Sequence, residues 1–91
     1  MHIPAEFNKL CERFFQDIDL VASTSEEIAD FLAKGLEGQE KQSLKPFLDD
    51  IIAHCSAEEL LRIWNASPAD FDMDNGEGLR AFLMVVRAKL M

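Results

Sequence analysis

The C-terminal end of the chain carries the pattern that constrains the fold most. From Asn75 to the last residue, apolar side chains recur three and four positions apart, which places them on one face of a helix. That face comprises Leu79, Phe82, Leu83, Val86 and Leu90. The rest of the helix is also largely apolar, and its thin polar face is marked by Arg80, Arg87 and Lys89. A helix that is apolar nearly all round is usually central, so we expect the other elements to pack around it.

Similar spacing predicts two helices in the first part of the chain. The first is expected at about 4–21, because Pro4 suits a first helical turn. Its inward stripe is Phe7, Leu10, Cys11, Phe14, Ile18 and Val21. The second is expected after Thr24, which has the spacing of a capping box with Glu27. Its inward residues are Ile28, Phe31, Leu32 and Leu36. Gly35 is expected to end this helix in the left-handed conformation.

A third helix has a clear end and an open start. Its inward stripe is Leu44, Phe47, Leu48, Ile51, Ile52 and Cys55. If Ser43 is the cap, Pro46 lies in the first turn and costs little. If the helix begins near Gln39, Pro46 removes one backbone hydrogen bond and bends the helix. We favour a start at 39–43 and leave the choice within that range open.

Ser56 and Glu59 form the strongest capping signal in the chain and predict a short fourth helix that ends near Asn65. Pro68 prevents a simple continuation of this helix. Glycine and proline are few, at four and three, which disfavours an all-β fold with its many tight turns. The sequence therefore predicts an all-α fold in which residues 1–91 form a single compact bundle of about five helices.

The charge balance excludes some partners. Seventeen acidic residues oppose nine basic ones, for a net charge of -8. Phosphate backbones repel such a surface, so we expect no nucleic-acid partner. The longest apolar run, at 81–86, is too short to cross a bilayer, and no secretion signal precedes the first helix. Cys11 and Cys55 do not make a disulfide scaffold, so we expect a cytoplasmic protein without a membrane partner.

No motif in the sequence predicts catalysis. The acids that begin at Asp70 match an EF-hand loop poorly, because glycine comes one position late and Ala81 replaces the bidentate glutamate. Cys11 and Cys55 lie on apolar stripes, which favours core packing over a zinc site. Paired carboxylates such as 58–59 are explained by helix caps and the helix dipole. We therefore expect a protein that is not an enzyme and that uses no metal or cofactor.

The segment 70–77 is the candidate binding region. Acidic and apolar side chains alternate over 70–74, and Glu77 follows. In the structural interpretation, the apolar side chains hold the connection on the core and Asn75 caps the last helix. In the functional interpretation, the acids steer and dock a basic partner, with Trp64 as an aromatic anchor. The two are compatible. The candidate partner-binding residues are Trp64, Asp70, Phe71, Asp72, Asp74 and Glu77.

Two stretches, from Glu59 to Phe71 and from Asp74 to Leu83, carry a resemblance to a known family. Together with the preceding helix at 44–52, they resemble small bacterial immunity proteins of contact-dependent growth-inhibition and related polymorphic toxin systems. The resemblance covers roughly half of the chain. It implies a cognate toxin domain, often a nuclease, that is bound tightly in the cytoplasm. The chain differs from the acidic colicin nuclease inhibitors in having no tyrosine, the residue that anchors their interfaces.

We therefore expect an immunity protein that neutralises a basic toxin domain by non-covalent binding and that is a monomer or weak dimer when free. The alternative is a helical adaptor or homodimer without a toxin partner. In that alternative, an apolar face that includes Met84 and Met91 pairs with another helix.

Overall fold

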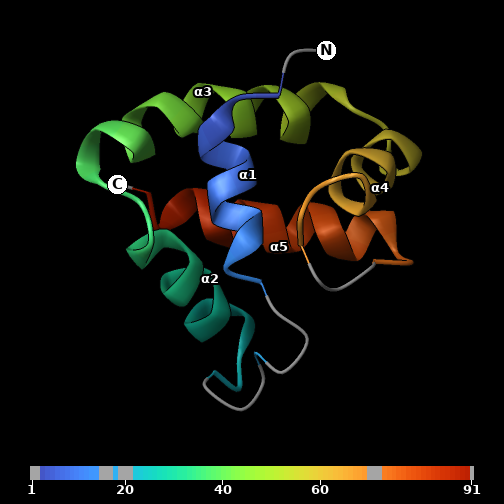
Figure 1. Cartoon of the computed structure of the whole chain (residues 1–91). Coiled ribbons are helices and arrows are strands. Elements are labelled where there is room, and N and C mark those ends of the chain that lie inside the picture. Colours follow the sequence, from blue (N-terminus) through green and yellow to red (C-terminus); the bar gives the residue numbers. More distant parts are fainter. Residues whose placement is uncertain (1–2, 15–17, 19–21, 70–72, 91) are drawn as a thin grey trace.

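The described part of the chain contains five helices and no strand, which confirms the predicted all-α fold (Figure 1). The computed structural model describes residues 3–14, 18, 22–69 and 73–90. The helices are α1 (Ala5–Glu12), α2 (Ser25–Lys34), α3 (Gly38–His54), α4 (Ala57–Asn65) and α5 (Gly76–Ala88).

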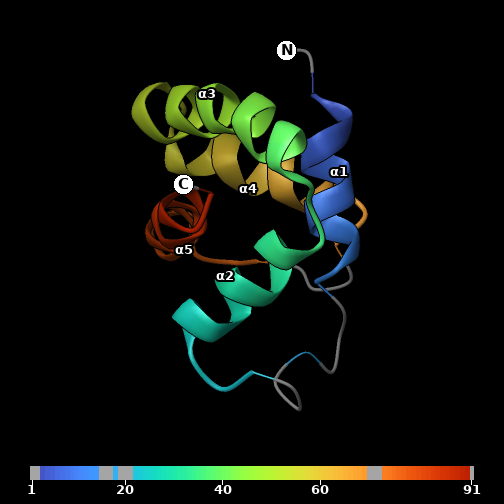
Figure 2. The ribbon, with the colours of Figure 1, turned by 90° about the vertical axis from the view of Figure 1, so that its left-hand side faces the viewer.

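Helix α5 packs against three other helices, but it is not enclosed on all sides as its nearly all-apolar pattern predicts, because Ala81, Met84 and Ala88 are exposed. It contacts α2, α3 and α4. It runs alongside α3 in the opposite direction, and α1 crosses in front of both (Figure 1). Figure 2 looks along α5 and places α3 on one side of it and α2 on another. The residues predicted to face inward are all buried: Leu79, Phe82, Leu83, Val86 and Leu90.

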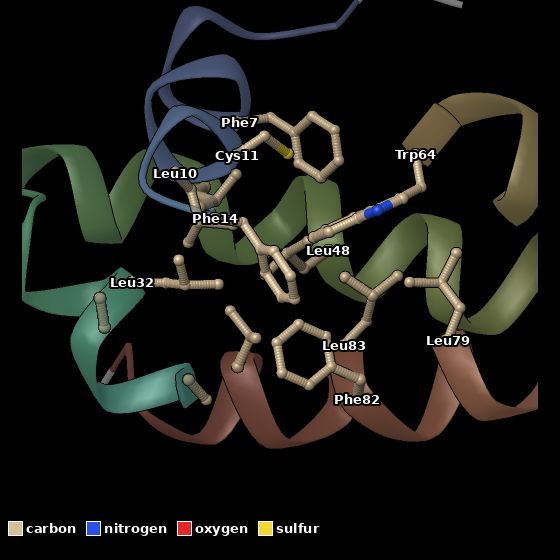
Figure 3. Packing of buried hydrophobic residues seen from close by; sticks show 14 of the residues in the cluster. Phe7, Leu10, Cys11, Phe14, Leu32, Leu48, Trp64, Leu79, Phe82 and Leu83 are labelled. Carbon is tan, nitrogen blue, oxygen red and sulfur yellow. The ribbon is translucent and has the colours of Figure 1, made fainter. Parts of the chain in front are cut away.

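Aromatic rings around Trp64 join the helices at the core. The Trp64 ring lies 5.4 Å from Phe14 and 6.1 Å from Phe82, measured between ring centroids. Phe7 lies 6.5 Å from Trp64 and also contacts Phe47 of α3 at 5.3 Å. These pairs are edge-to-face, an arrangement that contributes about 0.5–1.5 kcal/mol per pair beyond burial. Figure 3 shows Phe7, Phe14, Trp64 and Phe82 converging between α1, α4 and α5.

Three helices begin at the predicted capping residues. Thr24, Ser56 and Asn75 each accept a hydrogen bond of 3.1 Å from the backbone N–H three positions later. Glu59 completes the box by accepting from the Ser56 backbone N–H at 2.9 Å. Each of these bonds satisfies a donor that the first helical turn leaves without a partner inside the helix.

Helix α3 begins at Gly38, one residue before the favoured range. Glu37 is its N-cap and forms a capping box with Glu40. The capping signal was missed because glutamate is not among the preferred N-cap residues. Pro46 therefore lies inside the helix, where its missing N–H removes one backbone hydrogen bond. Lys9 of α1 pairs with the Glu40 carboxylate at 2.9 Å, so the same cap also joins α1 to α3.

The prediction that the first helix reaches residue 21 is wrong. Helix α1 ends at Glu12, and Ile18 lies in a separate 3₁₀ turn. Phe14 and Ile18 are nevertheless buried, at 5% and 4% exposed. Their apolar spacing therefore reflects burial rather than one continuous helix. Val21, the last residue of the predicted stripe, lies outside the described residues.

Gly35 ends α2 but does not adopt the left-handed conformation that we predicted, because its φ is -76°. Its role is to make room for Arg13. A Cβ on Gly35 would lie 1.9 Å from the Arg13 Cδ. The Arg13 Nε donates to the Phe31 carbonyl at 3.0 Å, and its guanidinium lies 4.3 Å from the centre of the Phe31 ring. This contact ties the end of α1 to the end of α2.

Two smaller differences concern the faces and ends of helices. On α2 the buried face is centred on Ala29, Leu32 and Ala33, so Ile28 and Phe31 are only partly buried. The helical spacing predicted for α2 was correct. The direction of its buried face was not, because the prediction counted the large apolar side chains and left out the small alanines. Helix α5 ends at Ala88 rather than at the C-terminus.

We expect Gly35→Ala to destabilise the protein by about 1–2 kcal/mol, because the methyl group displaces Arg13 from its hydrogen bond and its ring contact. Gly38→Ala is the matched control, since nothing lies within 4 Å of an added Cβ there. Urea unfolding measures both effects. In an Arg13→Ala background the Gly35 substitution should be neutral or slightly stabilising. An equal loss in both backgrounds would contradict the packing explanation.

We expect the free energy of unfolding to fall as the pH drops below 4.5. Hydrogen bonds at the helix starts hold the pKa of Glu27, Glu40 and Glu59 below 4.5; for Glu59 the main donor is the Ser56 backbone N–H. A lowered folded-state pKa stabilises the protein above the unfolded value, and that contribution is lost on protonation. Glu59→Gln, measured by urea unfolding, should make the acid slope shallower. Identical slopes would contradict this role.

Candidate functional site

Three helix ends meet at one end of the molecule: the end of α3 and the starts of α4 and α5 (Figure 1). The starts are in direct contact, because a Cβ on Gly76 would lie 2.5 Å from Ala57. Arg80 ties α5 to α3 by donating to the carbonyls of Ile52 and, at 2.8 Å, of Cys55. These bonds satisfy carbonyl groups that the last turn of α3 leaves without a partner inside the helix.

Five exposed carboxylates lie in or next to the helix turns that form this end of the molecule, and we call this surface the acidic junction. Among the described residues, it comprises Asp50, Glu58, Glu59, Asp74 and Glu77, all of which are exposed. The positive ends of the α4 and α5 dipoles favour the negative charges of Glu58, Glu59 and Glu77, which lie in the first turns of these two helices. Because the two helix starts are in contact, this surface carries more negative charge than the start of a single helix would.

The carboxylates of the acidic junction differ in what they bind within the chain. Glu59 is used by the capping box, and Glu77 lies 3.6 Å from the Arg80 Nε. Asp50 lies 4.0 Å from His54 in an exposed i,i+4 pair, a type that contributes little. The side chains of Glu58 and Asp74 make no hydrogen bond or ion pair with the described residues. These two are the carboxylates most available to an external cation.

The predicted site residues fall in different places. Asp74 and Glu77 belong to the acidic junction, whereas Asp70, Phe71 and Asp72 lie outside the described residues. Trp64 is 1% exposed and packs in the aromatic core, so its ring does not reach the surface in this conformation. Glu58 and Glu59 were assigned to a helix cap and the helix dipole from sequence, and Asp50 was not among the predicted site residues. Their proximity to Asp74 depends on how α3, α4 and α5 pack.

Asn65, the last residue of α4, binds the backbone of Met73 near the other end of the connection between α4 and α5. The Asn65 amide accepts from the Met73 backbone N–H at 2.9 Å and donates to the Met73 carbonyl at 3.0 Å. Met73 also packs against the core, as the structural interpretation of this segment predicts. Asp74 follows directly, so this pair of hydrogen bonds fixes where the acidic junction receives its aspartate.

A second surface feature lies between α1 and α4. It is a groove of about 420 Å³ lined by Ile3, Phe7, Asn8, Arg62, Ile63, Ala66 and Ser67. Phe7 and the partly buried Ile3 and Ile63 make its apolar part. Sequence reasoning missed this groove, because it arises between two helices whose sequences give no sign of their distance from each other.

The cysteines lie in the interior and bind no second sulfur. Cys11 and Cys55 are both free thiols. Burial raises the pKa of Cys11 from 9.0 to about 12, although a hydrogen bond with Ser67 lowers it in part. Burial also raises the pKa of Cys55, and the charges of Glu59 and Asp50 act in the same direction. In residues 3–14, 18, 22–69 and 73–90, no three His, Cys, Asp or Glu side chains are grouped to hold a metal ion.

Comparison with known proteins adds no assignment, since no family model, curated protein or solved structure matches the chain. Within the described helices, none combines the length and the apolar character that crossing a bilayer requires.

We expect both thiols to resist alkylation by iodoacetamide at neutral pH in the folded protein and to react fully in urea. The reason is that the thiolate is the nucleophile and burial keeps both groups protonated. For Cys11 the raised pKa also means that stability is lost as pH rises from 9.0 towards 12. Mass spectrometry after timed labelling measures the first effect. Labelling of native Cys11 at the unfolded rate would contradict it.

Proposed function

We propose that this chain is an immunity protein that binds a basic toxin domain through the acidic junction and so blocks the toxin. The observation that carries the proposal is the contact between the starts of α4 and α5 at Ala57 and Gly76. That contact gathers Glu58, Asp74 and Glu77 at one end of a chain whose net charge is -8.

The electrostatics of the junction favour a positively charged partner. The carboxylates of Glu58 and Asp74 are exposed and have no ion-pair partner among the described residues. Such groups raise the rate of encounter with a basic surface without needing deep burial. A nuclease-type toxin supplies that surface, since its substrate groove must attract phosphate.

The toxin part of the proposal rests on the resemblance described for residues from Glu59 to Phe71 and from Asp74 to Leu83. The two stretches include most of α4, the first part of α5 and three members of the acidic junction, Glu59, Asp74 and Glu77. A cytoplasmic site of action belongs to the same proposal. It is consistent with two cysteines that are free thiols rather than a disulfide.

The proposal predicts that co-expression of this chain rescues growth of cells that produce the toxin domain encoded by the adjacent reading frame. Neutralising the junction with Glu58→Gln, Asp74→Asn and Glu77→Gln should then slow association with that domain by on the order of tenfold at low salt. It should also flatten the salt dependence of the association rate. Stopped-flow mixing measures both quantities.

The matched control removes the same charge elsewhere, with Glu12→Gln, Glu26→Gln and Asp30→Asn on α1 and α2. It should change the association rate far less than the junction variant does. Equal effects of the two triple variants would show that net charge alone matters and would contradict the docking site. Absence of both rescue and a complex with the wild-type chain would remove the immunity proposal.

The alternative of a homodimer or helical adaptor has weaker support. Met84 of α5 is 56% exposed, and it is the one large apolar side chain in the exposed class among the described residues. Met91, the other residue expected on that face, lies outside them. A stable dimer normally buries about 800 Å² on each partner, which a single methionine does not supply.

A further inference from the structure

We propose that the groove between α1 and α4 is a second contact site, which takes a partner segment that presents a large apolar side chain next to a carboxylate. This inference deepens the proposed function and rests on it for the identity of the partner. The groove measures about 420 Å³, near the lower end of the range of about 300–1,000 Å³ for ligand pockets.

The apolar part of the groove is the reason for assigning a large apolar side chain to the ligand. Phe7 forms its inner wall and is itself held in the core by edge-to-face contacts with Phe47 and Trp64. Ile3 and Ile63 are only partly buried, so each keeps apolar surface in contact with solvent. A large apolar side chain seated between them would complete the burial that the chain alone leaves unfinished.

The polar rim of the groove is the reason for assigning a carboxylate to the ligand. Arg62 of α4 and Asn8 of α1 are exposed, and neither side chain makes a hydrogen bond or ion pair with another described residue. In contrast, Arg80 and Arg87 are engaged with backbone carbonyls and with Asp49, respectively. A guanidinium without a partner beside an amide is a donor pair for a carboxylate, because its planar fork matches the two oxygens.

The charge of the ligand follows from the surroundings of Arg62. Glu59, one turn earlier on α4, lies close enough for Arg62 to lower its pKa. With a single cation at the rim and a net charge of -8 on the chain, a monoanion is accommodated more easily than a phosphate dianion. We therefore assign a carboxylate rather than a phosphate to this rim.

The source of the ligand follows from the position and openness of the groove. Sites for small molecules commonly enclose about 70–90% of the ligand surface, whereas Asn8, Arg62 and Ala66 are all exposed here. An open groove suits a side chain whose position is supported by the rest of a protein interface. Helix α4 carries both the groove and two residues of the acidic junction, Glu58 and Glu59, so one partner can reach both surfaces.

The test uses a probe rather than the unidentified partner. N-acetyl-L-phenylalanine carries a phenyl ring and a carboxylate. N-acetyl-L-phenylalaninamide carries the same ring, with a neutral carboxamide in place of the carboxylate. Both are titrated into the full chain, labelled with ¹⁵N, in about 0.15 M salt, where the Debye length is about 8 Å. We expect the acid to shift the backbone amide signals of Phe7, Asn8, Ile63, Ala66 and Ser67, and to bind about tenfold more tightly than the amide.

Arg62→Gln should remove the preference for the acid while the amide still binds. Lys41→Gln, which removes one positive charge from α3, is the control and should keep the preference. Equal binding of acid and amide to the wild-type chain, or signal changes outside the groove, would overturn the assignment. These outcomes do not involve the acidic junction, so failure here leaves the proposed function to its own test with the toxin domain.

Discussion

Burial of the Trp64 ring is the interaction on which the rest of the structure depends. Its neighbours come from the start of α1, from the turn that follows α1 and from the middle of α5. Through Phe7 the same cluster reaches Phe47 of α3. Because edge-to-face rings pack well in few relative orientations, this cluster sets both the distance and the crossing of the helices. Phe7 belongs to this cluster and also lines the groove between α1 and α4, so the packing of the cluster sets the inner wall of that groove.

Arginine side chains complete the helix ends that the aromatic core leaves open. Arg13 closes α1 against α2, and Arg80 donates to the last turn of α3. Both use the planar guanidinium on backbone carbonyls, which lysine would reach with a single rotatable group. In a chain with nine basic residues, this use leaves Glu58 and Asp74 without an ion-pair partner among the described residues. Arginines that bind backbone carbonyls inside the fold are thus not available to neutralise carboxylates on the surface.

The sequence predicted what depends on neighbouring residues and missed what depends on packing. The caps at Thr24, Ser56 and Asn75 and the buried face of α5 follow from short spacings, and the structure confirms them. The end of α1 and the role of Gly35 depend on a contact between residues far apart in the chain, so no local pattern contained them. For the candidate site, Asp74 and Glu77 were found from sequence, but the approach of Glu58 and Asp50 requires the packed helices.

The position of Trp64 also determines how this protein can be observed. The chain has one tryptophan and no tyrosine, so its near-ultraviolet emission comes from a single indole. That indole is 1% exposed and lies inside the bundle. Its emission therefore reports whether the interior is intact, and a ligand that settles on the outside without loosening the helices leaves the spectrum unchanged. Loss of folding and occupation of the surface are optically separable events in this molecule.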